Sequence, residues 1–87
     1  MGTSDPQVYC PANQWTTVLW SAGFGDYTGT FTDQMQDIDW ERHSAAPPFY
    51  TTGRHETKYA FGAILVGPYT DFRFKPKQGL TVTWHLL

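Results

Sequence analysis

The chain of 87 residues has little charge, a single cysteine and no long apolar run. Charged residues make up 16% of the chain and the net charge is −2, so there is no general electrostatic attraction to nucleic acid or anionic lipid. A lone cysteine, Cys10, excludes a disulfide-stapled scaffold and indicates a reducing compartment. The longest apolar run, residues 61–66, is too short to cross a bilayer. We therefore expect one small domain, without an export signal, that binds neither nucleic acid nor membrane.

Aromatic residues are abundant instead. The chain has four tryptophans, five tyrosines and six phenylalanines, which together make up 17% of it. This exceeds what a core of this size needs, so one or two rings are expected at the surface. The candidates are Trp15, near the N-terminus, and Tyr50, beside a diproline. An exposed ring can stack on a sugar or anchor a protein interface, and the sequence leaves both open.

An alternation of period two, which is typical of half-buried β-strands, begins at Trp15 and continues to the end of the chain. For example, Tyr27 and Phe31 fall on one face of a strand and three threonines on the other. The expected strands are 15–20, 27–32, 36–41, a short edge strand at 49–52, a longer strand at 56–66, 69–75 and 80–86. Since no stretch has helical apolar spacing, we predict an all-β domain.

The last two strands carry the clearest alternation. Phe72 and Phe74 alternate with charged residues, residues 76–79 read Pro-Lys-Gln-Gly, and apolar residues then alternate with polar ones from Leu80 on. A proline-initiated turn between two such strands predicts a C-terminal hairpin. The fold predicted overall is a small antiparallel β-sandwich of six to seven strands, jelly-roll or immunoglobulin-like, with a small β-barrel as the alternative.

The first fourteen residues contain two prolines and no sustained period. They are therefore expected to form an extended arm, residues 1–14, ahead of a single sandwich domain, residues 15–87. The arm would pack on its own domain or on a neighbouring molecule, and the sequence does not decide between the two. Val8, Tyr9 and Trp15 are the expected interface anchors.

An acidic row lies on one expected strand and suggests a cation site. Asp37, Asp39 and Glu41 follow at every second residue, with Asp33 before them. Carboxylates with this spacing lie roughly 6 to 7 Å apart in a line, whereas a hard cation needs oxygens that converge on one point. We interpret the row as a solvated strand face that discourages edge pairing, and the sequence cannot settle whether it binds a cation.

The histidines offer a second metal hypothesis. His43 and His55 flank a loop between two strands and would meet there with Glu41 or Glu56 as a third zinc ligand. No pair of cysteines and no short histidine spacing supports such a site. We therefore expect these two residues and His85 to be structural or exposed, with no metal and no cofactor.

No pattern of residues predicts catalysis or nucleic-acid binding. Cys10 has no histidine or cationic run beside it in the sequence, and no serine stands in a nucleophile-elbow motif. Arg73 and Lys75 are interleaved with Phe72 and Phe74 in a manner that suggests a face for single-stranded nucleic acid. The strand period places the rings and the cations on opposite faces, however, so we expect neither an enzyme nor a nucleic-acid-binding protein.

The C-terminal half resembles small β-sandwich structural proteins of tailed-phage virions. The segments that carry the resemblance are Asp39-Trp40-Glu41, Pro47-Pro48-Phe49-Tyr50, residues 69–76 and residues 79–84. In those proteins a strand with a tryptophan precedes a loop, and an aromatic-Arg-aromatic strand turns into a last strand of alternating Thr and Val. The resemblance covers about half the chain and implies a decoration or accessory protein, with no catalytic residue carried over.

The leading functional expectation is therefore a non-enzymatic assembly protein. It would act as a homo-oligomer or stabilise a larger assembly such as a viral capsid, located in the virion and assembled in the host cytoplasm. The oligomeric order, the partner, and a position in head or tail do not follow from the sequence. The alternative is a carbohydrate-binding β-sandwich that uses exposed aromatic rings.

Overall fold

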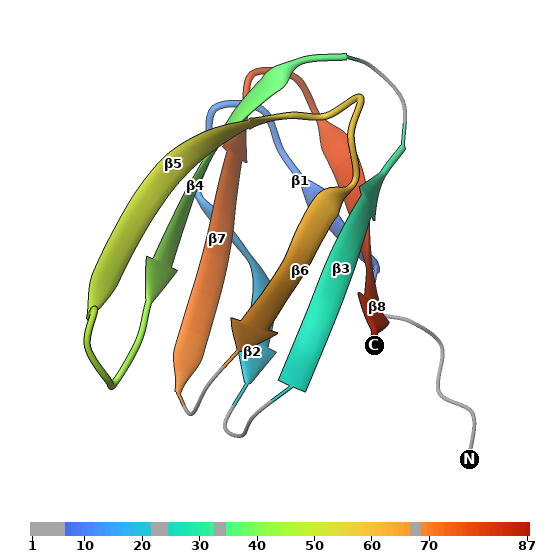
Figure 1. Cartoon of the computed structure of the whole chain (residues 1–87). Helices are drawn as coiled ribbons and strands as arrows, with labels where there is room; N and C mark the ends of the chain where they lie inside the picture. Colours follow the sequence, from blue (N-terminus) through green and yellow to red (C-terminus); the bar gives the residue numbers. More distant parts are fainter. Residues whose placement is uncertain (1–6, 22–24, 33–34, 67–68) are drawn as a thin grey trace.

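The computed structural model describes residues 7–21, 25–32, 35–66 and 69–87, without the side chains of 21 and 63–66. These residues form eight strands and no helix (Figure 1). The strands are β1 (Gln7–Cys10), β2 (Thr16–Ser21), β3 (Gly25–Phe31), β4 (Asp37–His43), β5 (Tyr50–Glu56), β6 (Phe61–Val66), β7 (Thr70–Pro76) and β8 (Leu80–Leu86). The all-β prediction is confirmed, with eight strands in place of six or seven.

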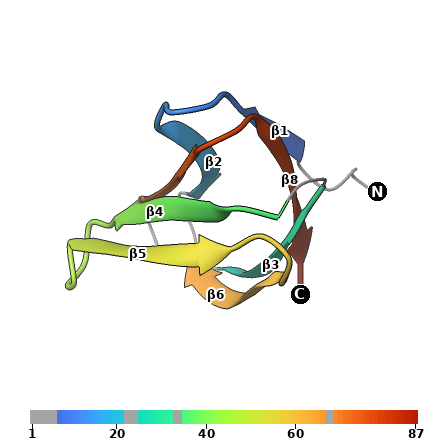
Figure 2. The same ribbon diagram turned by 90° about the horizontal axis from the view of Figure 1, so that it is seen from above.

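The strands form two antiparallel sheets that face each other. One sheet has the order β1-β8-β3-β6 and the other β2-β7-β4-β5. Seen from above, β4 and β5 of one sheet lie across from β3 and β6 of the other (Figure 2). Among these eight strands, β4 and β5 are the one consecutive pair that are neighbours in a sheet, and every other connection passes between the sheets. This is the jelly-roll form of the predicted sandwich.

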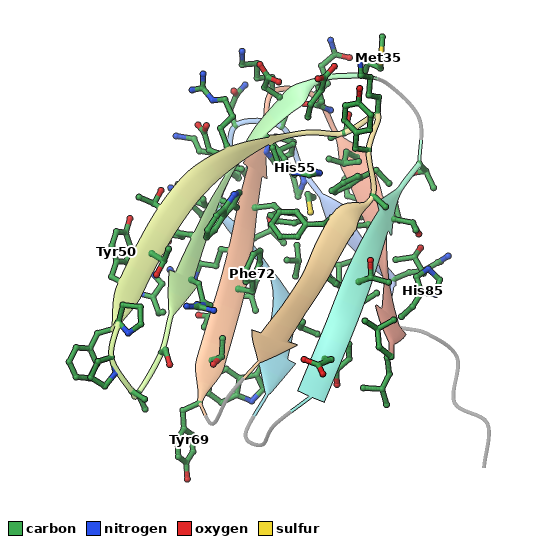
Figure 3. All side chains as sticks on the ribbon, in the orientation of Figure 1. Met35, Tyr50, His55, Tyr69, Phe72 and His85 are labelled. Atoms are coloured by element: carbon green, nitrogen blue, oxygen red, sulfur yellow. The ribbon has the colours of Figure 1, made fainter. Side chains whose placement is uncertain are left out.

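The core consists of the inward-facing residues of both sheets. Phe72 and Phe74 of β7 are buried against Trp84 of β8, with ring centroids 5.9 Å from Trp84 in each case. Phe72 lies between the two sheets in Figure 3. The predicted alternation of these phenylalanines with Arg73 and Lys75 is confirmed, because the charged pair lies on the outer face.

The predicted C-terminal hairpin is wrong, although both of its strands form. β7 belongs to one sheet and β8 to the other, so residues 77–79 cross between the sheets. Gln36 holds this crossing: its Oε1 accepts hydrogen bonds from the backbone N–H of Lys77 (2.8 Å) and of Gln78 (3.0 Å). A short turn and two alternating strands fit either arrangement, and burial of both apolar faces in one core favours the crossing.

The single strand expected at 56–66 is also two strands. β5 ends at Glu56, a turn follows, and β6 begins at Phe61 in the opposite sheet. The short edge strand expected at 49–52 is confirmed as an edge strand but extends through Gly53 to Glu56.

From Gln7 to Cys10 the expected arm packs on its own domain, as a regular strand. Residues 7–10 form β1, which pairs with β8 of the same chain, Val8 opposite Val82 and Cys10 opposite Leu80. Cys10 is fully buried in the core and Val8 packs against it, which explains why so short a segment pairs here. Residues 1–6 lie outside the described residues.

Two strand glycines are covered by tryptophan rings from the neighbouring strand. Gly53 of β5 lies opposite Trp40 of β4, and Gly29 of β3 lies opposite Trp84 of β8. A Cβ atom built on Gly53 would come within 2.7 Å of the Trp40 ring, and one on Gly29 within 3.0 Å of the Trp84 ring. Glycine at these positions leaves room for the large rings that fill the core.

Candidate functional site

The outer face of the sheet β2-β7-β4-β5 carries the densest group of interacting polar side chains in the described residues. The strand register arranges them in three rows. The first contains Lys75, Asp39 and Arg54; the second contains Thr17, Arg73, Glu41 and Thr52; the third contains Trp20, Asp71, His43 and Tyr50. We call this surface the network face. The register places opposite charges on neighbouring strands about 4.8 Å apart, and ion pairs join Arg54 to Asp39 (3.0 Å) and Arg73 to Glu41 (3.5 Å).

Arg73 is the centre of the network. It donates to Asp71 Oδ2 from Nε (2.9 Å) and Nη2 (2.7 Å), and its Nη1 lies 3.5 Å from Glu41 Oε1. Thr17 donates to the other oxygen of Asp71 at 2.8 Å. Two guanidinium donors on Oδ2 and a hydroxyl on Oδ1 therefore fix the Asp71 carboxylate in one orientation.

Glu41 is a nearly buried carboxylate on the outer side of a sheet, with 8% of its surface exposed. Tyr50 donates its hydroxyl to Glu41 Oε2 at 2.9 Å, and His43 Nε2 lies 3.1 Å from Glu41 Oε1. The rings of His43 and Tyr50 lie 4.9 Å apart and cover it. The acidic row was interpreted as a solvated face, and for Glu41 this is wrong because its neighbours on three strands enclose it.

Both central carboxylates are held in their ionised form. Partial burial would raise the pKa of Glu41, but hydrogen bonds from His43 and Tyr50 and the positive charge of Arg73 outweigh it, so the pKa lies below its ordinary value. Burial would likewise raise the pKa of Asp71, but hydrogen bonds from Arg73 and Thr17 outweigh it, so this pKa also lies below its ordinary value. The network therefore holds two ionised carboxylates in fixed positions, of which Glu41 is nearly buried.

A β-bulge in β2 brings an aromatic ring to the network face. The register between β2 and β7 shifts between Thr17 and Leu19, so that Val18 and Leu19 are both buried while Thr17 and Trp20 both face outward. Without the extra residue, strict alternation from Thr17 would turn Trp20 into the core. Bulges that re-aim a side chain in this way are common beside functional sites.

Exposed rings border the network on two sides. On the β2 side Trp20 is 58% exposed and lies 6.5 Å from the ring of Tyr69. Trp15, also on this side, lies under Lys75, with Nζ 5.8 Å from the ring centroid. On the β5 side Tyr50 is 53% exposed and projects away from the strand (Figure 3).

The predicted interface residues do not form one group. Trp15 and Tyr50 are exposed, as predicted; Tyr50 belongs to the network face and Trp15 borders it under Lys75. Tyr9 is exposed but lies on β1 in the other sheet, and Val8 is half-buried against the core. Sequence reasoning missed the grouping of Trp20 with Asp71, Glu41, His43 and Arg73, since it depends on a bulge and on the pairing of β4 with β7.

The metal hypotheses find no support in the geometry. His43 pairs with Tyr50 and His55 with Ile38, at opposite ends of β5, and His55 contacts the rings of Phe31 and Phe61. Within residues 7–21, 25–32, 35–66 and 69–87, no three histidine, cysteine or acidic side chains are grouped to hold a metal ion. Asp33 lies outside these ranges.

Cys10 is enclosed by the core, and burial raises the pKa of its thiol to about 11. A thiol in this environment is neutral and unreactive at physiological pH.

Within the part of the chain that the structure describes, no helix is long and apolar enough to span a membrane.

Comparisons with known proteins add no relative. No family model matches the chain, and neither does any curated protein or any solved structure.

Proposed function

We propose that this protein is a non-enzymatic carbohydrate-binding domain and that the network face binds the glycan. The observation that carries the proposal is the position of exposed Trp20 and Tyr50 on two sides of an ordered polar network. Aromatic faces stack on the apolar faces of sugars, and fixed carboxylates and hydroxyls bond sugar hydroxyls. An open sheet face offers both kinds of contact to an extended ligand.

The carboxylates of the network suit binding and not glycoside cleavage. A glycosidase needs one carboxylic acid whose pKa is raised so that it can protonate the leaving group. The pKa values of Glu41 and Asp71 are both lowered, so both accept hydrogen bonds at neutral pH. A carboxylate offers about four acceptor positions, of which three are occupied in each case.

The charge balance favours a neutral glycan. The rows of the network face hold three carboxylates, those of Asp39, Glu41 and Asp71, and three permanent cations, those of Arg54, Arg73 and Lys75. The charges cancel over short distances, so the face exerts no net attraction on an acidic sugar.

A glycan array tests the proposal. The wild-type protein should retain a set of neutral oligosaccharides, and Trp20→Ala should lose them. Tyr59→Ala removes a ring of similar exposure in the β5–β6 turn, outside the network face, and should bind as the wild type does. Absence of any neutral glycan ligand, or equal loss in both variants, would count against the proposal.

Assembly of copies is a second candidate function, with a specific observation in its favour. β1 is an edge strand of its sheet and carries exposed Tyr9. An edge strand with an exposed ring can pair with another chain, and jelly rolls build viral shells as well as lectins. Since Val8 packs inward, Tyr9 is the one expected anchor on β1 that is available for contact with another copy. Light scattering tests this candidate: an oligomer that Tyr9→Asp dissociates supports it, and a strict monomer contradicts it.

A further inference from the structure

Arg42 of β4 lies on the opposite side of the strand from Glu41. Alternation along β4 points Ile38, Trp40 and Arg42 toward the space between the sheets. Arg42 is paired with buried Phe72 on one side and with Thr51 on the other. An arginine at a core-facing position is unusual because its charge loses hydration there.

One polar atom of each residue in this pair lacks a hydrogen-bond partner among the described residues. Arg42 Nε and Thr51 Oγ1 are both shielded from solvent, and neither forms a hydrogen bond with another described residue. No ion pair to Arg42 is found among the described residues. The acidic residues of β4 pair with other arginines: Glu41 with Arg73, and Asp39 with Arg54. Buried hydrogen-bond donors are nearly always paired in folded proteins, so the unpaired Arg42 Nε requires an explanation.

We propose that Arg42 and Thr51 bind an oxyanion, a carboxylate or phosphate group, on the inner face of β4 and β5, where the two residues are paired. The planar guanidinium matches such a group with two parallel N–H donors. Directly paired residues on antiparallel strands have Cβ atoms about 4.5 to 5.5 Å apart, so the Thr51 hydroxyl can donate a third bond. Arg42 keeps part of its surface exposed, which gives a small anion access from solvent.

The aromatic surroundings strengthen such an interaction. Trp40, next to Arg42 on the same side of β4, stacks on Phe72 with ring centroids 5.4 Å apart and 14° between the planes. An apolar setting lowers the local dielectric and makes a paired charge interact more strongly. This site faces away from the network face and does not depend on the glycan proposal.

Thermal unfolding in inorganic phosphate, at constant ionic strength against chloride, tests the site. Phosphate should raise the Tm of the wild type, and Arg42→Met should abolish the rise. Thr51→Val should weaken phosphate binding about tenfold or less, as loss of one hydrogen bond predicts. Arg54→Gln removes an exposed arginine on the outer face of β5 and should keep the full response.

Acetate in the same assay distinguishes the two sources of the oxyanion. A rise with both anions indicates general carboxylate and phosphate recognition, and a rise with phosphate alone indicates a phosphate site. If Arg42→Met does not fold, Arg42→Lys keeps the charge without the planar fork and should show a smaller rise than the wild type. No rise with either anion, or the same rise in wild type and Arg42 variants, overturns the proposal.

Discussion

Arg73 and Glu41 lie opposite each other on β7 and β4, with Arg73 Nη1 3.5 Å from Glu41 Oε1. The same guanidinium holds Asp71 through two further hydrogen bonds. Two carboxylates that are far apart in the sequence thus share one cation, and this arrangement decides how the protein responds to acid.

The free energy of unfolding should fall in acid because of this network. Glu41 and Asp71 have lower pKa values in the folded state than their ordinary 4.5 and 3.8. A group of this kind stabilises the fold above its unfolded pKa and loses that contribution as the pH falls through its folded pKa. Urea unfolding should therefore give a steady value from pH 7 to about 5 and a decline below about pH 4. Glu41→Gln with Asp71→Asn should flatten this decline, and an unchanged acid slope would show that the network is not responsible.

The Cys10 thiol should resist labelling in the native protein. Its pKa is raised from 9.0 to about 11 by burial, so the thiolate forms only at high pH or after unfolding. The stabilisation from keeping it neutral is present below pH 9 and is lost as the pH rises toward 11, amounting to about 2 to 3 kcal/mol. A thiol reagent at pH 8 should react slowly in buffer and rapidly in denaturant. Rapid labelling in buffer would mean that β1 does not pack against β8.

Gly53→Ala should destabilise the protein by about 1 to 3 kcal/mol, as overpacking does elsewhere. The new methyl group meets the Trp40 ring at 2.7 Å, and that ring is stacked on Phe72 and cannot move freely. Gly62→Ala is the matched control, since nothing lies within 4 Å of its Cβ position. Gly62→Ala should leave the free energy of unfolding unchanged or raise it by up to about 1 kcal/mol. If chemical denaturation gives the same change in the free energy of unfolding for both variants, Gly53 is not packed against Trp40.

Gln36→Ala should lower the free energy of unfolding by about 1 kcal/mol, because the Lys77 and Gln78 amides lose their acceptor but lie in an exposed crossing where water can replace it. Its Nε2 also donates to the Gln78 carbonyl at 3.0 Å. Gln14→Ala changes an exposed glutamine before β2 and should have little effect. If the two variants unfold at the same denaturant concentration, the crossing from β7 to β8 does not depend on Gln36.

The sequence predicted strands and faces well because both follow from local alternation. One such case is the alternation of buried Phe72 and Phe74 with outward-facing Arg73 and Lys75. It could not predict which strands pair, since residues 76–79 fit a hairpin and a sheet crossing equally well. The same limit hid the candidate site: Glu41 and Arg73 meet only through the register of β4 with β7.

Two further features were missed for reasons of length and spacing. β1 has four residues, too few to show a period between its flanking prolines. Trp20 reaches the outer face only through the bulge after Thr17, and no residue type in that segment marks a bulge.

Chemical-shift mapping by NMR tests the central claim most directly. A neutral oligosaccharide selected on the array is titrated into the labelled protein, and backbone and indole signals are followed. We predict that the shifts cluster on the network face, at the Trp20 indole and the amides of Asp71, Arg73, Glu41 and Tyr50. Shifts confined to the outer face of the sheet β1-β8-β3-β6, or none at saturating glycan, would contradict it.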